Sequence, residues 1–239
     1  MATTLAPHLP ERSITLVHPT ALRPLDRERG ARRLLNIIVA TAGLLVALPL
    51  ILVIAVLVKL TSRGPVLFQQ SRVGLDRRSL SRVGGNTRRH LDLGGQPFTM
   101  YKFRTMYTHR GTRERQVWAQ PDDQRVTPIG RILRKLRLDE LPQLINVLRG
   151  EMNVVGPRPE QPDIFVYLRE QIEGYQRRQR VRPGITGWAQ VNQAYDRSID
   201  DVRRKVTLDL EYIRRQSALE DVKIMWRTLP VMLLGRGAW

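Results

Sequence analysis

One stretch near the N-terminus is apolar along its whole length. Residues 34–58 read LLNIIVATAGLLVALPLILVIAVLV and carry no charged side chain. At about 1.5 Å per residue, a helix of this length reaches the roughly 30 Å of a bilayer's hydrocarbon core. A buried core helix is usually shorter, and a cleaved signal peptide has a shorter apolar run that starts nearer the N-terminus. The pattern therefore favours insertion into a membrane.

The charges around this stretch bear on how it inserts. Cationic side chains flank it on both sides: Arg32, Arg33, Lys59 and Arg63. A helix that crosses the membrane once usually has more cations on one side than on the other. Cations at both ends of this stretch therefore favour an arrangement in which both ends of the helix lie on the cytoplasmic side. Pro49 lacks an N–H donor and clashes with the preceding turn, so it can break or bend the helix. We predict a re-entrant membrane helix hairpin over residues 31–60, with a Pro-kinked single span as the alternative.

Short β-like segments and then amphipathic helices follow. Residues 65–74 and 98–106 have the alternation of strands, and residues 77–95 between them resemble an Arg- and Gly-rich loop. Three apolar stripes with helical spacing come next: Ile129, Ile132, Leu133 and Leu136; Leu141, Leu144, Ile145 and Leu148; Ile164, Phe165, Leu168 and Ile172. We therefore expect a small mixed α/β domain, rich in helices, over residues 61–239.

Weaker signals mark the two ends of the chain. Residues 1–30 contain several prolines and end in a run of charges, so we expect a weakly ordered tail with room for a short strand at residues 13–17. Two patterns resemble capping boxes, which begin helices: Ser198 with Asp201, and Ser217 with Glu220. The helix after Ser217 has an apolar face that includes Trp226 and fits either a protein core or a membrane headgroup region.

Composition narrows the classes of function. The chain carries 40 Lys and Arg against 22 Asp and Glu, a formal net charge of +18. Such a surface attracts nucleic acid, anionic lipid or phosphorylated substrates. No helix-turn-helix, zinc or aromatic RNA-binding motif accompanies the charge, so we expect no nucleic acid partner. Cysteine is absent, which excludes disulfides and thiolate metal sites.

An acidic pair stands inside a cationic region. Asp139 and Glu140 come just before Pro142, which fits only the first turn of a helix, so a helix is predicted to begin at or just after Asp139. An isolated pair of this kind would be a helix cap. Here cations stand upstream and downstream: Lys102, Arg104, Arg131, Arg134, Lys135, Arg137 and Arg158. Arginine suits phosphate because its planar fork gives two parallel hydrogen bonds.

This arrangement fits a carboxylate that attacks a phosphoryl group while cations neutralise the phosphate oxygens. Two adjacent carboxylates also suit Mg²⁺, which binds one or two carboxylates together with substrate phosphates. We predict that Asp139 and Glu140 are catalytic and hold the metal. The expected ligands of the substrate phosphates are Lys102, Arg104, Arg134 and Arg158.

Five blocks of sequence resemble the bacterial sugar transferases, also called monotopic phosphoglycosyl transferases. They are GPVLFQQSRVG at 64–74, YKFRTM at 101–106, IGRILRKLRLDELPQLINVLRGEMNVVGPRP at 129–159, VRPGITGWAQVN at 181–192 and LGRGA at 234–238. The resemblance runs from about Ala31 to Trp239. So many blocks in the same order do not arise by chance.

The resemblance implies an activity. Members of this family transfer a sugar phosphate from a UDP-sugar to a polyprenyl (undecaprenyl) phosphate and release UMP. The product primes the synthesis of exopolysaccharide, capsule, O-antigen or glycoprotein glycan. The family's nucleophile falls on Asp139, which would form an aspartyl-phosphosugar intermediate. Glu140 would assist with Mg²⁺ or with the incoming phosphate, and the family's phosphate-binding arginine falls on Arg134.

The resemblance also implies a place and a fold. The fold would be a mixed α/β catalytic domain with a re-entrant membrane helix and amphipathic helices on the membrane. The protein would be monotopic, on the cytoplasmic face of the bacterial inner membrane, where it would contact lipids of the inner leaflet. A homo-oligomer is compatible with the sequence. Leu48 stands where many relatives carry a serine before the proline, which leaves the angle of the hairpin open.

Some alternatives stay open. The segment Arg182-Pro183-Gly184 fits either a structural turn or part of a nucleotide-sugar pocket. Trp188 fits packing or base stacking. A membrane-tethered nucleic-acid binder and a non-catalytic scaffold are the competing functions. The missing nucleic-acid motifs count against the first, and the intact pair of Asp139 and Glu140 counts against the second.

Overall fold

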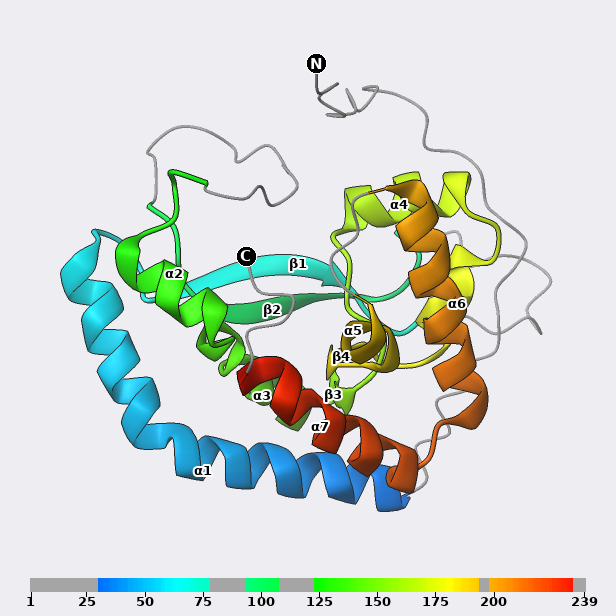
Figure 1. Cartoon of the computed structure of the whole chain (residues 1–239), viewed down its shortest axis with the longest axis horizontal. Coiled ribbons are helices and arrows are strands. Elements are labelled where there is room, and N and C mark those ends of the chain that lie inside the picture. The colour runs from blue at the N-terminus through cyan, green and yellow to red at the C-terminus, as the bar shows by residue number, and fades with distance from the viewer. Residues whose placement is uncertain (1–29, 78–92, 108–122, 194–197, 234–239) are drawn as a thin grey trace.

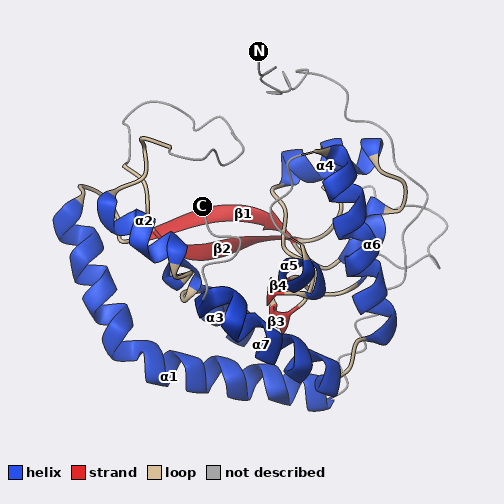
Figure 2. Ribbon diagram, viewed as in Figure 1, coloured by secondary structure: helices blue, strands red, loops and turns tan. Residues whose placement is uncertain are grey.

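The computed structural model describes residues 30–77, 93–107, 123–193 and 198–233. The predicted N-terminal tail, its short strand and most of the predicted loop at 77–95 lie outside these residues. Within them the protein is a helix-rich α/β fold, as the sequence predicts, and its strands form two small sheets. Figure 2 shows the strands in the middle of the domain, with helices around them.

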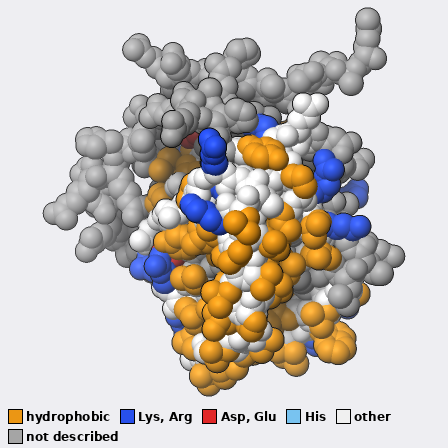
Figure 3. All heavy atoms as spheres, turned by 90° about the vertical axis from the view of Figure 1, so that its left-hand side faces the viewer, with side chains coloured by type: hydrophobic (Ala, Val, Ile, Leu, Met, Phe, Trp, Pro, Cys, Tyr) orange, Lys and Arg blue, Asp and Glu red, His pale blue; other side chains and the backbone are white. Residues whose placement is uncertain are grey.

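Helix α1 (Gly30–Thr61) contains the whole apolar stretch. Among the described residues it is the one helix long and apolar enough to cross a membrane. Most of its large apolar side chains are exposed, and Figure 3 shows a broad apolar face with Lys and Arg side chains at its margin. An exposed apolar surface of this extent indicates contact with lipid or with another protein.

Helix α1 bends near its middle (Figure 1), and Pro49 lies inside it. A proline removes one helical hydrogen bond and can bend a helix without ending it. The predicted break at Pro49 is therefore a bend, and residues 31–60 form two arms of one continuous helix. Both arms pack on the domain, because Ala40 in one arm and Ile54 and Val58 in the other belong to its apolar core.

The strands form two sheets of two strands each. Strand β1 (Leu67–Val73) pairs antiparallel with β2 (Pro97–Phe103), with Gln70 opposite Met100. Strand β3 (Asn153–Val155) pairs in parallel with β4 (Gly184–Thr186). The sequence predicts the two strands of the first sheet and misses those of the second, because strands of three residues are too short to show alternation.

The three apolar stripes fall on three helices, as predicted. The helices and 3₁₀ turns after β2 are α2 (Pro128–Lys135), η1 (Leu138–Glu140), α3 (Gln143–Leu148), α4 (Pro162–Gln171), η2 (Tyr175–Arg180), α5 (Trp188–Asn192), α6 (Ile199–Arg215) and α7 (Ala218–Leu233). Both predicted caps are confirmed. The Ser198 hydroxyl accepts from Asp201 N–H at 3.2 Å, and the Ser217 hydroxyl accepts from Glu220 N–H at 3.1 Å.

The apolar faces of these elements meet in the core. Phe165 of α4 and Tyr175 of η2 pack with β1 and α6, and their rings lie 5.2 Å apart. Tyr212 of α6 and Ile224 of α7 pack with β3. Each large apolar side chain that is fully buried contributes about 1.5–3 kcal/mol. These contacts hold α4 and α6 against β1, and α6 and α7 against β3.

Candidate active site

A short turn carries the acidic pair. Asp139 and Glu140 lie in η1, which is closed by hydrogen bonds from Glu140 N–H to Arg137 O (3.2 Å) and from Leu141 N–H to Leu138 O (3.3 Å). Arg137 has a φ of 54°, and among the described residues it is the one non-glycine with a positive φ. This left-handed conformation is rare for a residue with a side chain. It turns the chain from α2 into η1 and aims the acidic pair into the domain.

The predicted start of the helix is shifted by a few residues. The α-helix α3 begins at Gln143, with Pro142 as the residue that precedes it, so Asp139 and Glu140 are not in its first turn. Proline has no N–H to donate to an earlier carbonyl. The turn before Pro142 is therefore closed by the tighter hydrogen bonds of a 3₁₀ helix, and α3 begins as a separate helix directly after Pro142.

Glu140 is held between two cations. Lys102 Nζ lies 2.9 Å and Arg158 Nη2 lies 2.8 Å from the same oxygen, Glu140 Oε1. The carboxylate is buried, with 6% of the residue exposed. Burial alone would raise the pKa of Glu140, but Arg158 and Lys102 outweigh burial and hold the pKa well below its usual range. Glu140 is therefore a fixed anion that orients two cations toward the site.

Asp139 has the opposite character. Its residue is 8% exposed, and within the described part of the chain no hydrogen-bond donor holds its carboxylate. Burial raises the pKa of Asp139 above its usual value, while the charges of Lys102, Arg134 and Arg158 partly oppose this effect. A buried carboxylate without bound donors is poorly solvated, which makes it a stronger nucleophile toward phosphorus. The two neighbouring acids thus have different environments and suit different roles.

The pH dependence of turnover should report the environment of Asp139. In the reaction predicted from the sequence, only the ionised carboxylate of Asp139 attacks, so kcat/KM should rise with pH through the pKa of Asp139 and be lost below it. Lys102→Met removes the cation that most strongly lowers this pKa. The pKa should then rise further, and the acid limb of kcat/KM should move to higher pH. Product release measured from about pH 5 to pH 9 tests this, and an unmoved acid limb contradicts it.

Two of the other predicted phosphate ligands lie beside this pair. Arg134 Nε donates to Thr105 Oγ1 at 2.9 Å, and the charge of Arg134 acts on Asp139. Arg158 reaches Glu140 from the turn that follows β3. Together with Lys102 they bring three cations from β2, α2 and that turn to one acidic pair. This agrees with the grouping that the sequence predicts.

Arg104 does not join this group, so its predicted role is corrected. Its guanidinium donates to Ser62 O at 2.7 Å and to Arg63 O at 3.0 Å, at the C-terminal end of α1. Arg104 is 3% exposed. It follows the last residue of β2, Phe103, so the strand alternation that would place it on the same face as Lys102 has ended. Arg104 therefore fixes the second arm of α1 to the domain.

The turn that carries Arg158 is supported from beneath by a buried arginine that the sequence did not single out. Arg178 Nη2 donates to Arg158 O at 3.0 Å, and Arg178 Nε donates to Asp209 Oδ2 at 2.7 Å. Arg178 Nη1 donates to Tyr175 Oη at 2.8 Å. Arg178 stands in an Arg-rich run, and no spacing in that run distinguishes its buried arginine from the others.

The segment Arg182-Pro183-Gly184 packs against the same turn. Arg182 Nε donates to Gly150 O at 2.8 Å, and Pro183 O accepts from Asn153 N–H at 2.8 Å. A Cβ on Gly184 would lie 2.0 Å from Gly156 N, so only glycine permits this approach. These contacts favour a structural turn at this segment over a part in a nucleotide-sugar pocket. Trp188 is likewise packed, with the guanidinium of Arg215 4.1 Å from its ring centre.

A groove opens beside Glu140. It encloses about 600 Å³ of empty space, part of it open to solvent. Its walls come from η1, α3, β4, α5 and α7: Arg137, Glu140, Leu141, Leu144, Ile185, Thr186, Gln190, Val191, Thr228 and Val231. The walls are mainly aliphatic. Their ionic groups are Arg137, which directly precedes η1, and Glu140, the last residue of η1. Arg182, Pro183 and Gly184 do not line this groove.

The acidic pair fits Mg²⁺ only in part. Within the described residues, no group of three or more acidic, histidine or cysteine side chains could form a metal site. Glu140 Oε1 is already engaged by two cations. What remains is the Asp139 carboxylate and the second oxygen of Glu140. This suits an ion that keeps several waters and is bound mostly by substrate phosphates.

Known proteins resemble this chain over most of its length. The sequence model of the family described as "Bacterial sugar transferase" matches residues 27–235. Undecaprenyl-phosphate glucose phosphotransferase of Komagataeibacter xylinus is 41% identical over 223 residues, which are 91% of this chain and 38% of that protein. UDP-N-acetylgalactosamine-undecaprenyl-phosphate N-acetylgalactosaminephosphotransferase of Aeromonas hydrophila is 41% identical over 207 residues, 87% of this chain and 44% of that protein.

A shorter relative is covered more completely. UDP-glucose:undecaprenyl-phosphate glucose-1-phosphate transferase of Caulobacter vibrioides is 39% identical over 220 residues, which are 90% of this chain and 75% of that protein. This chain thus spans less than half the length of the first two relatives.

Proposed function

Since the chain belongs to the bacterial sugar transferase family, we propose that it transfers a sugar 1-phosphate from a UDP-sugar to a polyprenyl phosphate. The observation that carries the proposal is the contrast within the acidic pair. Glu140 is bound by two cations, whereas Asp139 beside it is buried, has a raised pKa and is held by no donor in the described structure. Such a carboxylate fits the role of nucleophile.

The proposed reaction has two displacements at one phosphorus atom. An Asp139 oxygen attacks the phosphorus that bears the sugar, and the bond from that phosphorus to the UMP oxygen breaks, so UMP leaves with the electron pair. An oxygen of the polyprenyl phosphate then attacks the same phosphorus. The aspartyl–phosphorus bond breaks and Asp139 returns to a free carboxylate. The product is a polyprenyl diphosphate sugar, and the kinetics are ping-pong.

Each cation has a part in this scheme. Arg158, Lys102 and Arg134 neutralise the phosphate oxygens as charge develops on them. Glu140 holds Arg158 and Lys102 in place, and its charge opposes the effect of burial, which lowers the pKa of Lys102. Mg²⁺, bound by the diphosphate with Asp139 and Glu140, would supply further charge neutralisation.

The released nucleotide gives a direct test. Membranes containing the protein should release UMP from at least one UDP-sugar in a panel of glucose, galactose and N-acetylated sugars. Release should depend on Mg²⁺, and release beyond one UMP per protein should depend on added polyprenyl phosphate. Release of UDP instead of UMP would point to transfer of the sugar alone and would contradict the proposed reaction.

The groove beside Glu140 suits the lipid acceptor. Its aliphatic walls fit isoprene units, and its charged end lies at the reacting pair, where a lipid phosphate would have to stand. Leu144, in its wall, also approaches α1, since a Cβ on Gly43 would lie 3.2 Å from Leu144 Cδ1. An isoprenoid in this groove would therefore reach the membrane along α1.

Filling the groove should affect one substrate and spare the other. Val191→Trp places a large ring in the groove, so the KM for polyprenyl phosphate should rise about tenfold, the loss of roughly one good apolar contact. The KM for the UDP-sugar should stay within about twofold of wild type. If the KM for the UDP-sugar rises instead, the groove holds the nucleotide sugar and not the lipid.

The membrane part of the proposal is a re-entrant α1. Both arms of the bent helix pack on the domain, and side chains fix both of its ends. Exposed apolar side chains on α2 and α7, among them Ile132, Leu136 and Trp226, would rest on the same membrane surface. One domain cannot hold both ends of the helix from opposite sides of a bilayer.

Topology can be read with single cysteines, because the chain has none of its own. Gly30→Cys and Thr61→Cys place one thiol at each exposed end of α1. A maleimide that cannot cross membranes should label both in inside-out vesicles and neither in right-side-out vesicles. Labelling of the two positions from opposite sides would show a single span.

A further inference from the structure

The N-terminal arm of α1 carries two buried polar side chains in an otherwise apolar helix. Arg32 is 4% exposed and Asn36 is 2% exposed, and both face the domain together with Ala40, one helical turn further on. Burying polar groups is unfavourable unless each finds a partner. Their partners therefore show what this face of α1 does.

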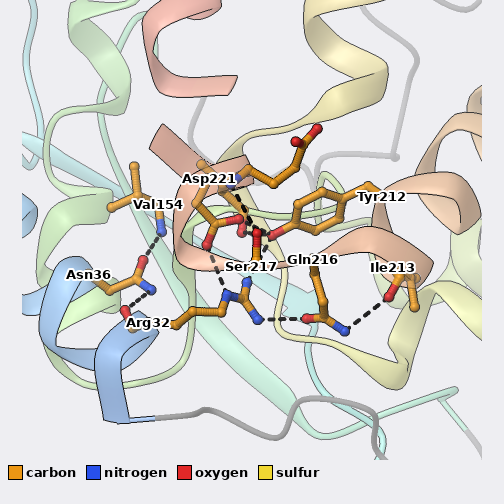
Figure 4. Close-up of polar contacts among 10 residues, drawn as sticks. Arg32, Asn36, Val154, Tyr212, Ile213, Gln216, Ser217 and Asp221 are labelled. Atoms are coloured by element: carbon orange, nitrogen blue, oxygen red, sulfur yellow. Dashed lines mark hydrogen bonds and ion pairs between the residues drawn. The ribbon is translucent and has the colours of Figure 1, made fainter. Parts of the chain in front are cut away.

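Asn36 binds the backbone of β3. Its Oδ1 accepts from Val154 N–H at 2.6 Å, and its Nδ2 donates to Arg32 O at 2.8 Å (Figure 4). Successive N–H groups of a strand point to opposite sides. Asn153 N–H points to Pro183 O beside β4, so Val154 N–H points away from that sheet, toward α1. Asn36 Oδ1 thus supplies the acceptor that a neighbouring strand would otherwise provide for Val154 N–H.

Arg32 reaches the same strand through a second path. Its Nε donates to Asp221 Oδ2 at 2.9 Å and its Nη2 to Tyr212 Oη at 2.9 Å. Tyr212 Oη lies 2.7 Å from Asp221 Oδ1 and 3.1 Å from Val155 O, and these acceptors share its one proton. Figure 4 shows Arg32 and Asn36 on α1, with Asp221 and Tyr212 on the neighbouring helices. Two consecutive residues of β3 are therefore tied to α1.

The strand leads directly into the turn that carries Arg158. Gly156 packs so closely that a Cβ on it would lie 2.5 Å from Arg182 O, and Pro157 and Pro159 stiffen the turn. On the far side, Arg178 holds Arg158 O. A shift of β3 toward or away from α1 would therefore be passed on to the Arg158 guanidinium, 2.8 Å from Glu140.

We propose that Asn36 and Arg32 are positioning residues that couple the seating of the membrane helix α1 to the placement of Arg158 in the active site. The proposal rests on the proposed function, because it concerns the cation that this function assigns to the substrate phosphates. It assigns a role in the reaction to residues of the membrane helix that touch neither substrate.

A double-mutant cycle tests the coupling. Asn36→Ala should lower kcat/KM about tenfold, because a small displacement of a catalytic group is enough for such a loss. In an Arg158→Ala background, the same change should lower kcat/KM by less than about twofold, since the group to be positioned is gone. An equal loss in both backgrounds, or no loss from Asn36→Ala alone, would overturn the proposal.

Arg33→Ala is the matched control. Arg33 is the neighbour of Arg32 and also ties α1 to the domain, but it donates to Val147 O and Leu148 O at the end of α3, each at 2.8 Å. Its removal weakens the docking of α1 to a similar degree without touching β3. It should lower kcat/KM by the same small factor with or without Arg158. A loss as large as that of Asn36→Ala would assign the effect to docking alone and overturn the proposal.

Hydrogen exchange separates this inference from the proposed function. In lipid nanodiscs, peptides covering residues 153–158 should exchange faster in Asn36→Ala than in wild type or in Arg33→Ala, whatever reaction the protein catalyses. Unchanged exchange in this segment would overturn the inference. Absence of UMP release from wild-type protein would remove the proposed function alone, because the exchange result stands without any turnover.

Discussion

Asp139→Asn should abolish turnover and leave the protein folded. The amide cannot form an acyl phosphate, so kcat should fall by about 10⁴-fold or more, the scale seen when a covalent nucleophile is removed. The dissociation constant of the UDP-sugar should change far less than kcat, because in the proposed scheme Asp139 meets the diphosphate of the bound donor only through Mg²⁺. Steady-state UMP release and donor binding, measured on the same preparation, check both parts.

The stability of this variant should separate lost chemistry from lost structure. Burial raises the pKa of Asp139 in the folded state, so its ionisation at neutral pH opposes folding. Asparagine removes that charge, and the thermal midpoint should stay the same or rise. Glu140→Gln is the contrasting control. It leaves Lys102 and Arg158 without their common counter-charge, and breaking a buried ion pair destabilises by about 3–5 kcal/mol. An inactive Asp139→Asn protein that melts early would not support the nucleophile role.

Arg158→Ala should have the next largest effect on catalysis. It removes a guanidinium 2.8 Å from Glu140 that we assign to the phosphate oxygens. Loss of one such preorganised charge typically reduces kcat about 10²–10³-fold. Arg158→Lys keeps the charge but loses the planar fork, so it should recover part of this loss. Both effects are read from kcat and from the KM for the UDP-sugar.

Arg203→Ala serves as the control for charge alone. Arg203 pairs with Asp200 on the surface of α6, where their side chains are 59% and 84% exposed. A surface pair of this kind contributes between zero and about 1 kcal/mol. The variant lowers the net charge by the same unit as Arg158→Ala, and its kcat should stay within about twofold of wild type. Equal losses in the two variants would mean that general charge, and not the placement of Arg158, governs turnover.

The sequence predicts the grouping of these side chains where local chemistry decides. The acidic pair, Arg134 and Arg158 are recognisable because carboxylates and guanidiniums cluster within a short segment, and the structure brings them together. The apolar stretch of α1 is equally plain, since its length and hydrophobicity need no tertiary information. The helices after it follow from apolar periodicity and from serine caps.

The sequence fails where tertiary contacts decide. Lys102 and Arg104 are two residues apart and look alike in the sequence, yet β2 ends between them and sends Arg104 to the end of α1. Arg178 is buried among similar arginines that are exposed or half-buried, and only the packing of α6 against η2 selects it. The left-handed conformation of Arg137 sets the direction of η1. The sequence does not predict this conformation, because such positions are usually occupied by glycine or asparagine.

The account depends on one covalent bond between the protein and a sugar phosphate. Membranes containing the protein should be incubated with a UDP-sugar labelled with ³²P in the sugar-bearing phosphate, without polyprenyl phosphate, and the trapped protein should be digested and sequenced by mass spectrometry. The predicted result is label on the peptide that contains Asp139, released when polyprenyl phosphate is added and missing in Asp139→Asn. Turnover by the wild type without any protein-bound label, or with label on another residue, would contradict it.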